Sequence, residues 1–117
     1  MIEKSAQAQG KRKPEIRGVV HRVVLWNLLP GVTEEQVDLM NTKGQEMLKQ
    51  VPGVVDLYFG VTMEADAPYR YYALLTLSSP EMVEVFNRHP LHAEFGELYF
   101  NHIIADPHYV VDYVIQS

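Results

Sequence analysis

The 117-residue sequence contains no cysteine, and this absence excludes several kinds of chemistry. A disulfide framework, a thiol nucleophile and a thiolate metal site all need that residue. No apolar run approaches the ~18 residues of a membrane-spanning helix. Residues 1–16 lack the apolar core of a secretory signal, so we expect a cytoplasmic protein with no membrane partner.

Positive charge is scarce, since 10 lysines and arginines stand against 15 acidic residues and the net charge is −5. Nucleic-acid binding needs a basic face, so nucleic acid is not an expected partner. The glycine-rich nucleotide loops, the hydrolase nucleophile elbow and the H-E-x-x-H zinc motif are also absent. The common motif-based enzyme assignments therefore do not apply, and we predict neither a cofactor nor a metal.

Apolar residues make up 47% and charged residues 21% of the chain, which is typical of one globular domain. Residues 1–16 are polar and contain the basic cluster Lys11–Lys13, so we interpret them as a flexible polar tail. Contact between that cluster and an acidic partner is the alternative interpretation, which so few charges do not favour. The domain itself is predicted to span residues 17–117.

The spacing of apolar residues predicts four strands and two helical segments. The strands are expected at 19–27, 54–62, 69–77 and 109–115, and the helical segments at 33–50 and about 80–103. Thr33 and Gln36 form a capping box at the start of the first helix. The second segment is broken at His89-Pro90. It then continues at helical spacing with Leu91, Phe95, Leu98 and His102. A turn is expected after it, at Asp106-Pro107.

The order β-α-β-β-α-β predicts an α+β fold, namely a ferredoxin-like protomer with a four-stranded antiparallel sheet. Right-handed crossovers place strands 19–27 and 69–77 at the centre of that sheet. The first strand is apolar on both faces, one with Val20, Arg22, Val24 and Trp26, the other with His21, Val23, Leu25 and Asn27. Helices cover only one face, so the second predicts a homodimer through the sheet face. We expect Tyr71 to share that uncovered face.

Two histidines stand three residues apart in His89-Pro90-Leu91-His92, a spacing that can place both on one helix face and bind a metal. Pro90 disturbs the helix between them, so we favour a structural role in which His89 hydrogen-bonds the backbone at the break. His21 lies within an apolar strand, where a histidine is more often a satisfied core residue than a catalyst. If His21 and His92 converge on one cavity, they become acid–base candidates.

Four stretches together resemble the stress-responsive A/B barrel (Dabb) domain family of the dimeric α/β-barrel superfamily. They are His21–Trp26 with Pro30–Thr33, Val51–Val54, Phe86–His92 and Val110–Tyr113. This resemblance implies a dimer whose two sheets close into a barrel. It also implies a ligand cavity between sheet and helices or at the barrel mouth.

Some members of that family are cofactor-free polyketide cyclases that use a histidine and a tyrosine. The histidine matches His92, and a first-strand histidine matches His21. The position of the family's catalytic tyrosine is occupied here by Phe86. Tyr71 stands where the family has a histidine on the third strand, and Gly44 stands where it has a tyrosine on the first helix. The resemblance thus implies His92, Tyr71 and His21 as candidate catalytic residues. It implies a ligand-binding set of His21, Val23, Leu25, Tyr71, Phe86, His89 and His92.

Three functions stay open at this point. The first is a domain that binds a small apolar or aromatic molecule without converting it. The second is a cofactor-free cyclase, lyase or monooxygenase in which His92 is the base and Tyr71 a proton donor. The third is an assembly role with a barrel filled by side chains. The apolar sheet face, the tyrosines and the missing catalytic hydroxyl at Phe86 favour the first.

Overall fold

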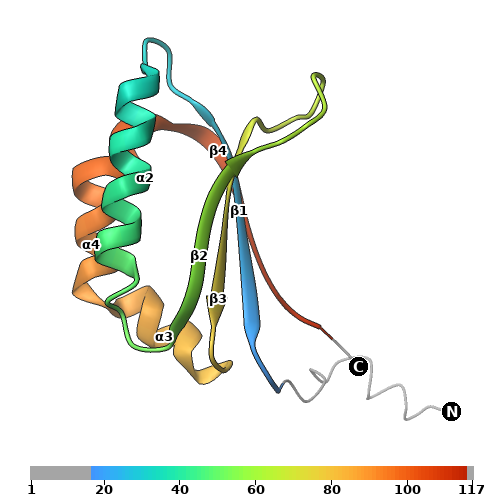
Figure 1. The fold of residues 1–117 in the computed structure, drawn as a ribbon, viewed down its shortest axis with the longest axis vertical. Helices are drawn as coiled ribbons and strands as arrows, with labels where there is room; N and C mark the ends of the chain where they lie inside the picture. Colours follow the sequence, from blue (N-terminus) through green and yellow to red (C-terminus); the bar gives the residue numbers. More distant parts are fainter. Residues whose placement is uncertain (1–16, 116–117) are drawn as a thin grey trace, which may run out of the picture.

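The computed structural model describes residues 17–115, so the predicted tail at 1–16 lies outside the described residues. The described chain forms an antiparallel four-stranded sheet in the order β2-β3-β1-β4, with helices on one face only (Figure 1). The elements are β1 (Val20–Leu28), α2 (Glu34–Leu48), β2 (Val54–Val61), β3 (Tyr71–Leu77), α3 (Glu81–Arg88), α4 (Pro90–Phe95), the π-helix η1 (Gly96–Phe100), α5 (Asn101–Ile103) and β4 (Ile104–Val114). The predicted ferredoxin-like protomer with β1 and β3 at the centre is confirmed.

The predicted capping box starts α2. The backbone N–H of Gln36 donates to Thr33 Oγ1 over 3.2 Å, and the backbone N–H of Thr33 donates to Gln36 Oε1 over 2.8 Å. The helix then packs a buried stripe against the sheet, formed by Val37, Met40, Gly44 and Leu48. Gly44 is needed for this close approach, because a Cβ there would lie 2.7 Å from the Phe59 ring.

The second helical segment changes phase in its middle. Gly96–Phe100 form a π-helix, whose wider turn inserts extra backbone into the helical repeat. Leu98, which the sequence grouped with Leu91 and Phe95 by its helical spacing, is therefore 54% exposed, whereas Phe95 is buried. Phe100 turns inward instead and packs edge-on against Trp26, with ring centroids 5.9 Å apart.

The predicted turn at Asp106-Pro107 is also wrong, because both residues lie inside β4. This strand is at the edge of the sheet, where a proline's missing N–H need not face a neighbouring strand. The pairing with β1 shifts register between Leu25 and Asn27, so β4 accommodates the proline in an irregular stretch.

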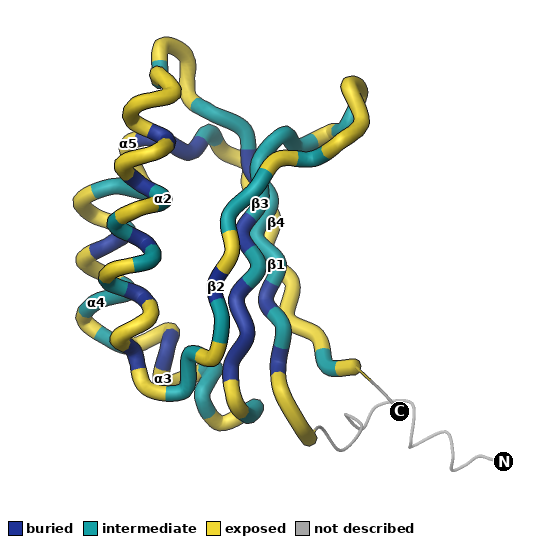
Figure 2. The backbone as a smooth tube through the Cα atoms, viewed as in Figure 1, coloured by how far each residue is buried: buried dark blue, intermediate teal, exposed yellow. Residues whose placement is uncertain are grey.

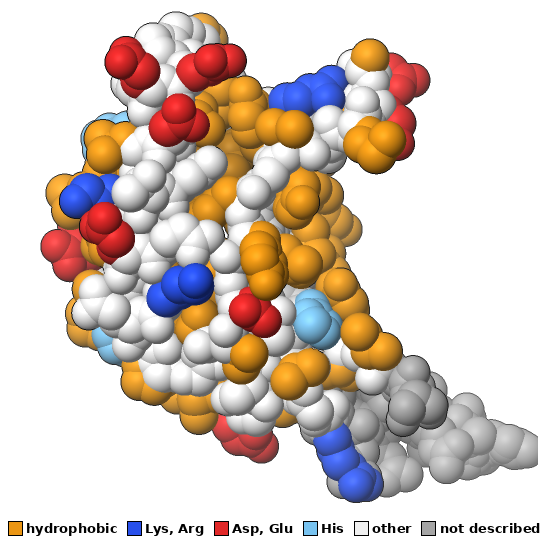
Figure 3. Space-filling model, in the orientation of Figure 1, with side chains coloured by type: hydrophobic (Ala, Val, Ile, Leu, Met, Phe, Trp, Pro, Cys, Tyr) orange, Lys and Arg blue, Asp and Glu red, His pale blue; other side chains and the backbone are white. Residues whose placement is uncertain are grey.

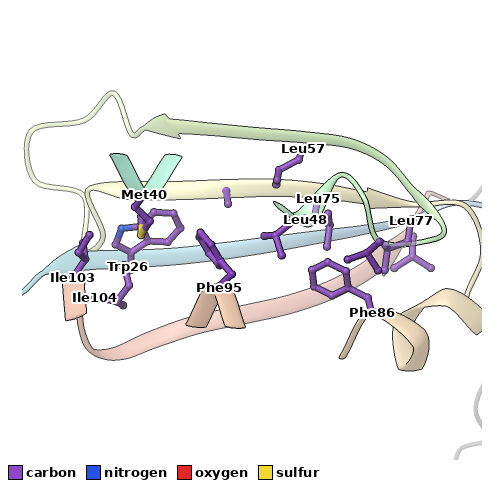
Figure 4. Close-up of a cluster of buried hydrophobic side chains, with 13 residues drawn as sticks. Trp26, Met40, Leu48, Leu57, Leu75, Leu77, Phe86, Phe95, Ile103 and Ile104 are labelled. Carbon is purple, nitrogen blue, oxygen red and sulfur yellow. The ribbon is translucent and has the colours of Figure 1, made fainter. Parts of the chain in front are cut away.

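The core lies between the sheet and the helices (Figure 4), and its largest fully buried side chains are Trp26, Met40 and Leu77. Most buried strand residues, among them Val20, Trp26 and Leu75, share the side of the sheet that faces the helices. Figure 2 shows these buried positions in dark blue along the strands, with further ones on the helices. The opposite side, which we call the open face, has no cover among the described residues. Figure 3 shows hydrophobic side chains gathered there. The strand registers assign to it His21, Val23, Leu25, Tyr58, Tyr72, Leu74, Thr76, Tyr109, Val111 and Tyr113.

Candidate functional site

A cavity of about 430 Å³ lies between the sheet and the helices, and we call it the helix-side pocket. Its walls are mainly apolar, and Trp26, Phe95 and Phe86 follow one another along it (Figure 4). The side chains with polar groups among its lining residues are Arg22, Trp26, His92, Asn101 and His108. The pocket therefore combines an aromatic body with a few polar groups, which is the usual make-up of a small-molecule site.

The structure separates the residues that the sequence proposed as one site. His92 and Phe86 line the helix-side pocket, whereas His21, Val23 and Leu25 lie on the open face. Successive side chains of a strand point to opposite faces of the sheet. Arg22 points to the helix side, so its neighbours His21 and Val23 point to the open face. His21 and His92 thus do not converge on one cavity.

Tyr71 does not share the open face with His21, contrary to expectation. It pairs with Trp26 across β1 and β3, and the two rings stack with centroids 6.4 Å apart on the helix side. It lines a second cavity of about 320 Å³ beside α2, together with Asp38 and Asn41. The tyrosine that the open face takes from β3 is Tyr72.

His21 and His89 have local structural partners. His21 Nδ1 lies 3.1 Å from Thr76 Oγ1, and its ring centroid lies 5.4 Å from that of Tyr113. The backbone N–H of Leu91 donates to His89 Nδ1 over 3.1 Å, so His89 caps α4 as the favoured structural interpretation predicted. Within residues 17–115, no group of three potential ligands is arranged to hold a metal ion.

Arg22 is the polar residue of this pocket that sequence reasoning missed. It is only 8% exposed, and its guanidinium makes a two-pronged ion pair with Asp112, Nε to Oδ1 at 2.7 Å and Nη2 to Oδ2 at 3.0 Å. Nη1 donates to Asn87 Oδ1 over 2.8 Å, and the guanidinium carbon lies 5.7 Å from the centre of the Phe86 ring. The sequence pattern could have indicated Arg22, because it alternates with Val20, Val24 and Trp26 on an apolar strand face. A charged side chain on a face that helices cover needs a partner of opposite charge.

His92 lies on α4 with its ring centroid 4.7 Å from that of Phe86. Burial lowers the pKa of His92 below its ordinary value, a hydrogen bond to the backbone of Asn87 opposes this, and the positive charge of Arg22 adds to the lowering. The imidazole is therefore neutral at neutral pH. In a neutral ring that donates one N–H, the other nitrogen is a hydrogen-bond acceptor and a proton acceptor.

A model of the family described as Stress responsive A/B Barrel Domain (Dabb) matches residues 20–115, nearly the whole described chain. The chain belongs to the Dabb family. This confirms the resemblance carried by the H-x-V-V-L strand and the H-P-x-H element. No curated protein matches the sequence of this Dabb domain.

Solved structures share the fold of this Dabb domain at low identity. A Dabb family protein with a ferredoxin-like fold from Mesorhizobium loti has a TM-score of 0.74 and 15% identity, covering 86% of this chain and 99% of that one. A dimeric ferredoxin-like protein of unknown function from Thermobifida fusca has a TM-score of 0.71 and 18% identity, covering 88% and 97%. A hydroxynitrile lyase from Passiflora edulis has a TM-score of 0.72 and 17% identity, covering 85% and 94%.

Among the described residues of this Dabb domain, no helix is long and apolar enough to cross a membrane.

His92→Asn is expected to reduce the acid sensitivity of folding. In the unfolded chain the pKa of His92 lies near the ordinary histidine value of about 6.5, whereas burial lowers its pKa in the folded domain. As the pH falls through about 6.5, the unfolded chain binds more protons than the folded domain, so the free energy of unfolding falls as the pH drops. Urea unfolding between about pH 7.5 and about pH 5.5 measures the fall, which should be smaller in the variant.

The exposed His102 supplies the matched control, and His102→Asn should keep the wild-type fall in stability. An equal fall in wild type and His92→Asn would show that His92 is protonated as easily in the folded domain as in the unfolded chain.

Proposed function

We propose that this Dabb domain is a homodimer that binds a small apolar or aromatic molecule in the helix-side pocket. The observation that carries the proposal is a cavity of about 430 Å³ with aromatic walls and few polar groups. Small-molecule sites span roughly 300–1,000 Å³ and have this kind of lining. Trp26, Phe95 and Phe86 would contact the aromatic or aliphatic body of the ligand.

The open face supports the dimeric part of the proposal. Tyr58 and Tyr109 are each 56% exposed and Tyr113 is 43% exposed, beside the less exposed Val23 and Leu25. Contiguous apolar surface of this kind typically marks an interface. Solved structures with the same fold are described as dimeric, including that from Thermobifida fusca. Packing two open faces together would bury these residues and leave each helix-side pocket within its own protomer.

A second candidate function is cofactor-free proton transfer in the same pocket. The observation that favours it is that His92 and Arg22 both line this pocket, where burial and the charge of Arg22 lower the pKa of His92. An imidazole can act as a general base, and a buried cation can stabilise a developing negative charge. Tyr71 lines the second cavity and not the helix-side pocket, and Phe86 has no hydroxyl, so binding without conversion is favoured.

Native mass spectrometry of the freshly purified protein tests both parts of the proposal. We expect twice the chain mass, with a small organic adduct in some of the molecules. A chain that stays monomeric at micromolar concentration would contradict the homodimer. A dimer that carries no adduct and takes up no added aromatic compound would contradict the binding function and favour assembly.

A further inference from the structure

We propose that Arg22 makes the helix-side pocket selective for a neutral apolar molecule that carries a carbonyl group, whose oxygen accepts hydrogen bonds from the guanidinium. This inference rests on the proposed binding function, and it adds the chemical class of the ligand. It follows from the N–H groups of Arg22 that have no hydrogen-bond partner, from the charges near the guanidinium and from the aromatic residues that line the rest of the pocket.

The guanidinium has hydrogen-bond donors to spare. An arginine carries five N–H donors, and Arg22 uses three of them on Asp112 and Asn87. Arg22 has no further hydrogen-bond partner among residues 17–115, although the residue is only 8% exposed and lines the pocket. Two N–H groups, one on Nη1 and one on Nη2, are thus left for a ligand of the mainly apolar cavity that Arg22 lines, and buried donors without partners are costly.

The direction of these donors is set before any ligand arrives. Asp112 on β4 binds Nε and Nη2 of the guanidinium, Asn87 near the end of α3 binds Nη1, and the guanidinium carbon lies over the Phe86 ring. Arg22 and Asp112 face each other directly in the β1–β4 register, so the backbone itself positions the pair. A donor group held by three neighbours loses little side-chain entropy when it binds a ligand.

The charge around the guanidinium favours a neutral acceptor over an anion. Asp112 already balances the positive charge of Arg22, and the imidazole of His92 adds no charge at neutral pH. A carboxylate ligand would bring an uncompensated negative charge into an apolar cavity next to Asp112, which is unfavourable. A ketone, ester or amide oxygen would satisfy the free N–H groups without that cost. The body of the ligand would then lie along Trp26 and Phe95.

Nuclear magnetic resonance titration with matched probes tests this inference. Benzylacetone carries a carbonyl, butylbenzene has nearly the same body without one, and phenylbutanoate carries an anionic group instead. The chain has a single tryptophan, so the indole N–H signal of Trp26 reports entry into the pocket without ambiguity. The side-chain nitrogen signals of Arg22 report contact with the guanidinium.

We expect benzylacetone to bind at least about tenfold more tightly than butylbenzene, which corresponds to about 1.4 kcal/mol. Phenylbutanoate should bind more weakly than benzylacetone, and only the ketone should shift the Arg22 signals strongly. Equal affinities of ketone and hydrocarbon, or tighter binding of the acid, would overturn the inference and leave the proposed binding function standing. If none of the probes moves the Trp26 signal, the binding function itself fails.

Paired variants check the role of Arg22. Arg22→Met combined with Asp112→Asn removes the donors without leaving a lone carboxylate, and Asp112→Asn alone is the matched control. The double variant should lose the preference for the ketone while keeping its affinity for butylbenzene. If the double variant does not fold, Arg22→Lys replaces it, because an ammonium cannot reproduce the guanidinium fork and should weaken the preference. An unchanged preference in either folded variant would overturn the inference.

Discussion

Val23→Asp is expected to convert the proposed homodimer into folded monomers. Val23 lies at the centre of the open face, paired with Leu74 on one side and Val111 on the other. An interface between two open faces would bury the new carboxylate, and two-fold symmetry would introduce it twice. Burying an unpaired charge costs several kcal/mol, so the dimer should weaken by at least about a hundredfold.

The same substitution should leave the protomer folded, because the side chain of Val23 points away from the core between sheet and helices. Analytical ultracentrifugation over a range of concentrations measures the dissociation constant, and circular dichroism checks the secondary structure. Leu98→Asp is the matched control, since Leu98 is 54% exposed on the helix side and should keep the wild-type dimer. A Val23→Asp protein that stays as dimeric as wild type would show that the open face is not the interface.

Trp26→Ala is expected to destabilise the domain by about 3–5 kcal/mol, the usual cost of truncating a large buried aromatic side chain. Trp26 is 1% exposed and lies against the rings of Phe59, Tyr71 and Phe100, at centroid distances of 6.4, 6.4 and 5.9 Å. The substitution removes a wall of the helix-side pocket as well as these contacts. Thermal unfolding measures the stability, and titration with an aromatic probe should show weaker binding.

Trp26→Phe separates packing from hydrogen bonding at the same position. Trp26 Nε1 is buried without a hydrogen-bond partner among the described residues, so phenylalanine removes an unsatisfied donor and loses no hydrogen bond. Its cost should therefore be well below that of Trp26→Ala, and the domain should stay folded with most of its pocket. A loss of stability as large as that of Trp26→Ala would mean that the indole N–H has a partner in solution.

The sequence alone was sufficient for the elements whose signals are local. Thr33 and Gln36 predict the start of α2 because a capping box involves only four residues. The alternation in β1 predicts a strand with two apolar faces, and the two-helix pattern predicts that one of these faces stays uncovered. The H-P-x-H element correctly marked a helix break capped by His89, since this contact spans two residues.

Tertiary structure decided which of the chemically interesting residues meet. Arg22 and Asp112 are 90 residues apart in the chain, and only the pairing of β1 with β4 makes them partners beside the helix-side pocket. The register between β1 and β3 pairs Tyr71 with Trp26 and so places Tyr71 on the helix side. A shift of one residue in the pairing of two strands is enough to put a side chain on the other face of the sheet. The π-helix at Gly96–Phe100 places Phe100 against Trp26 and leaves Leu98 exposed.

Thus the local spacing of apolar residues determined the order of strands and helices. It also determined that the sheet has a second apolar face, which the helices do not cover. The composition of the pocket depended on cross-strand register and on the phase of one helix. Both are set by long-range packing, which a pattern of neighbouring residues does not encode.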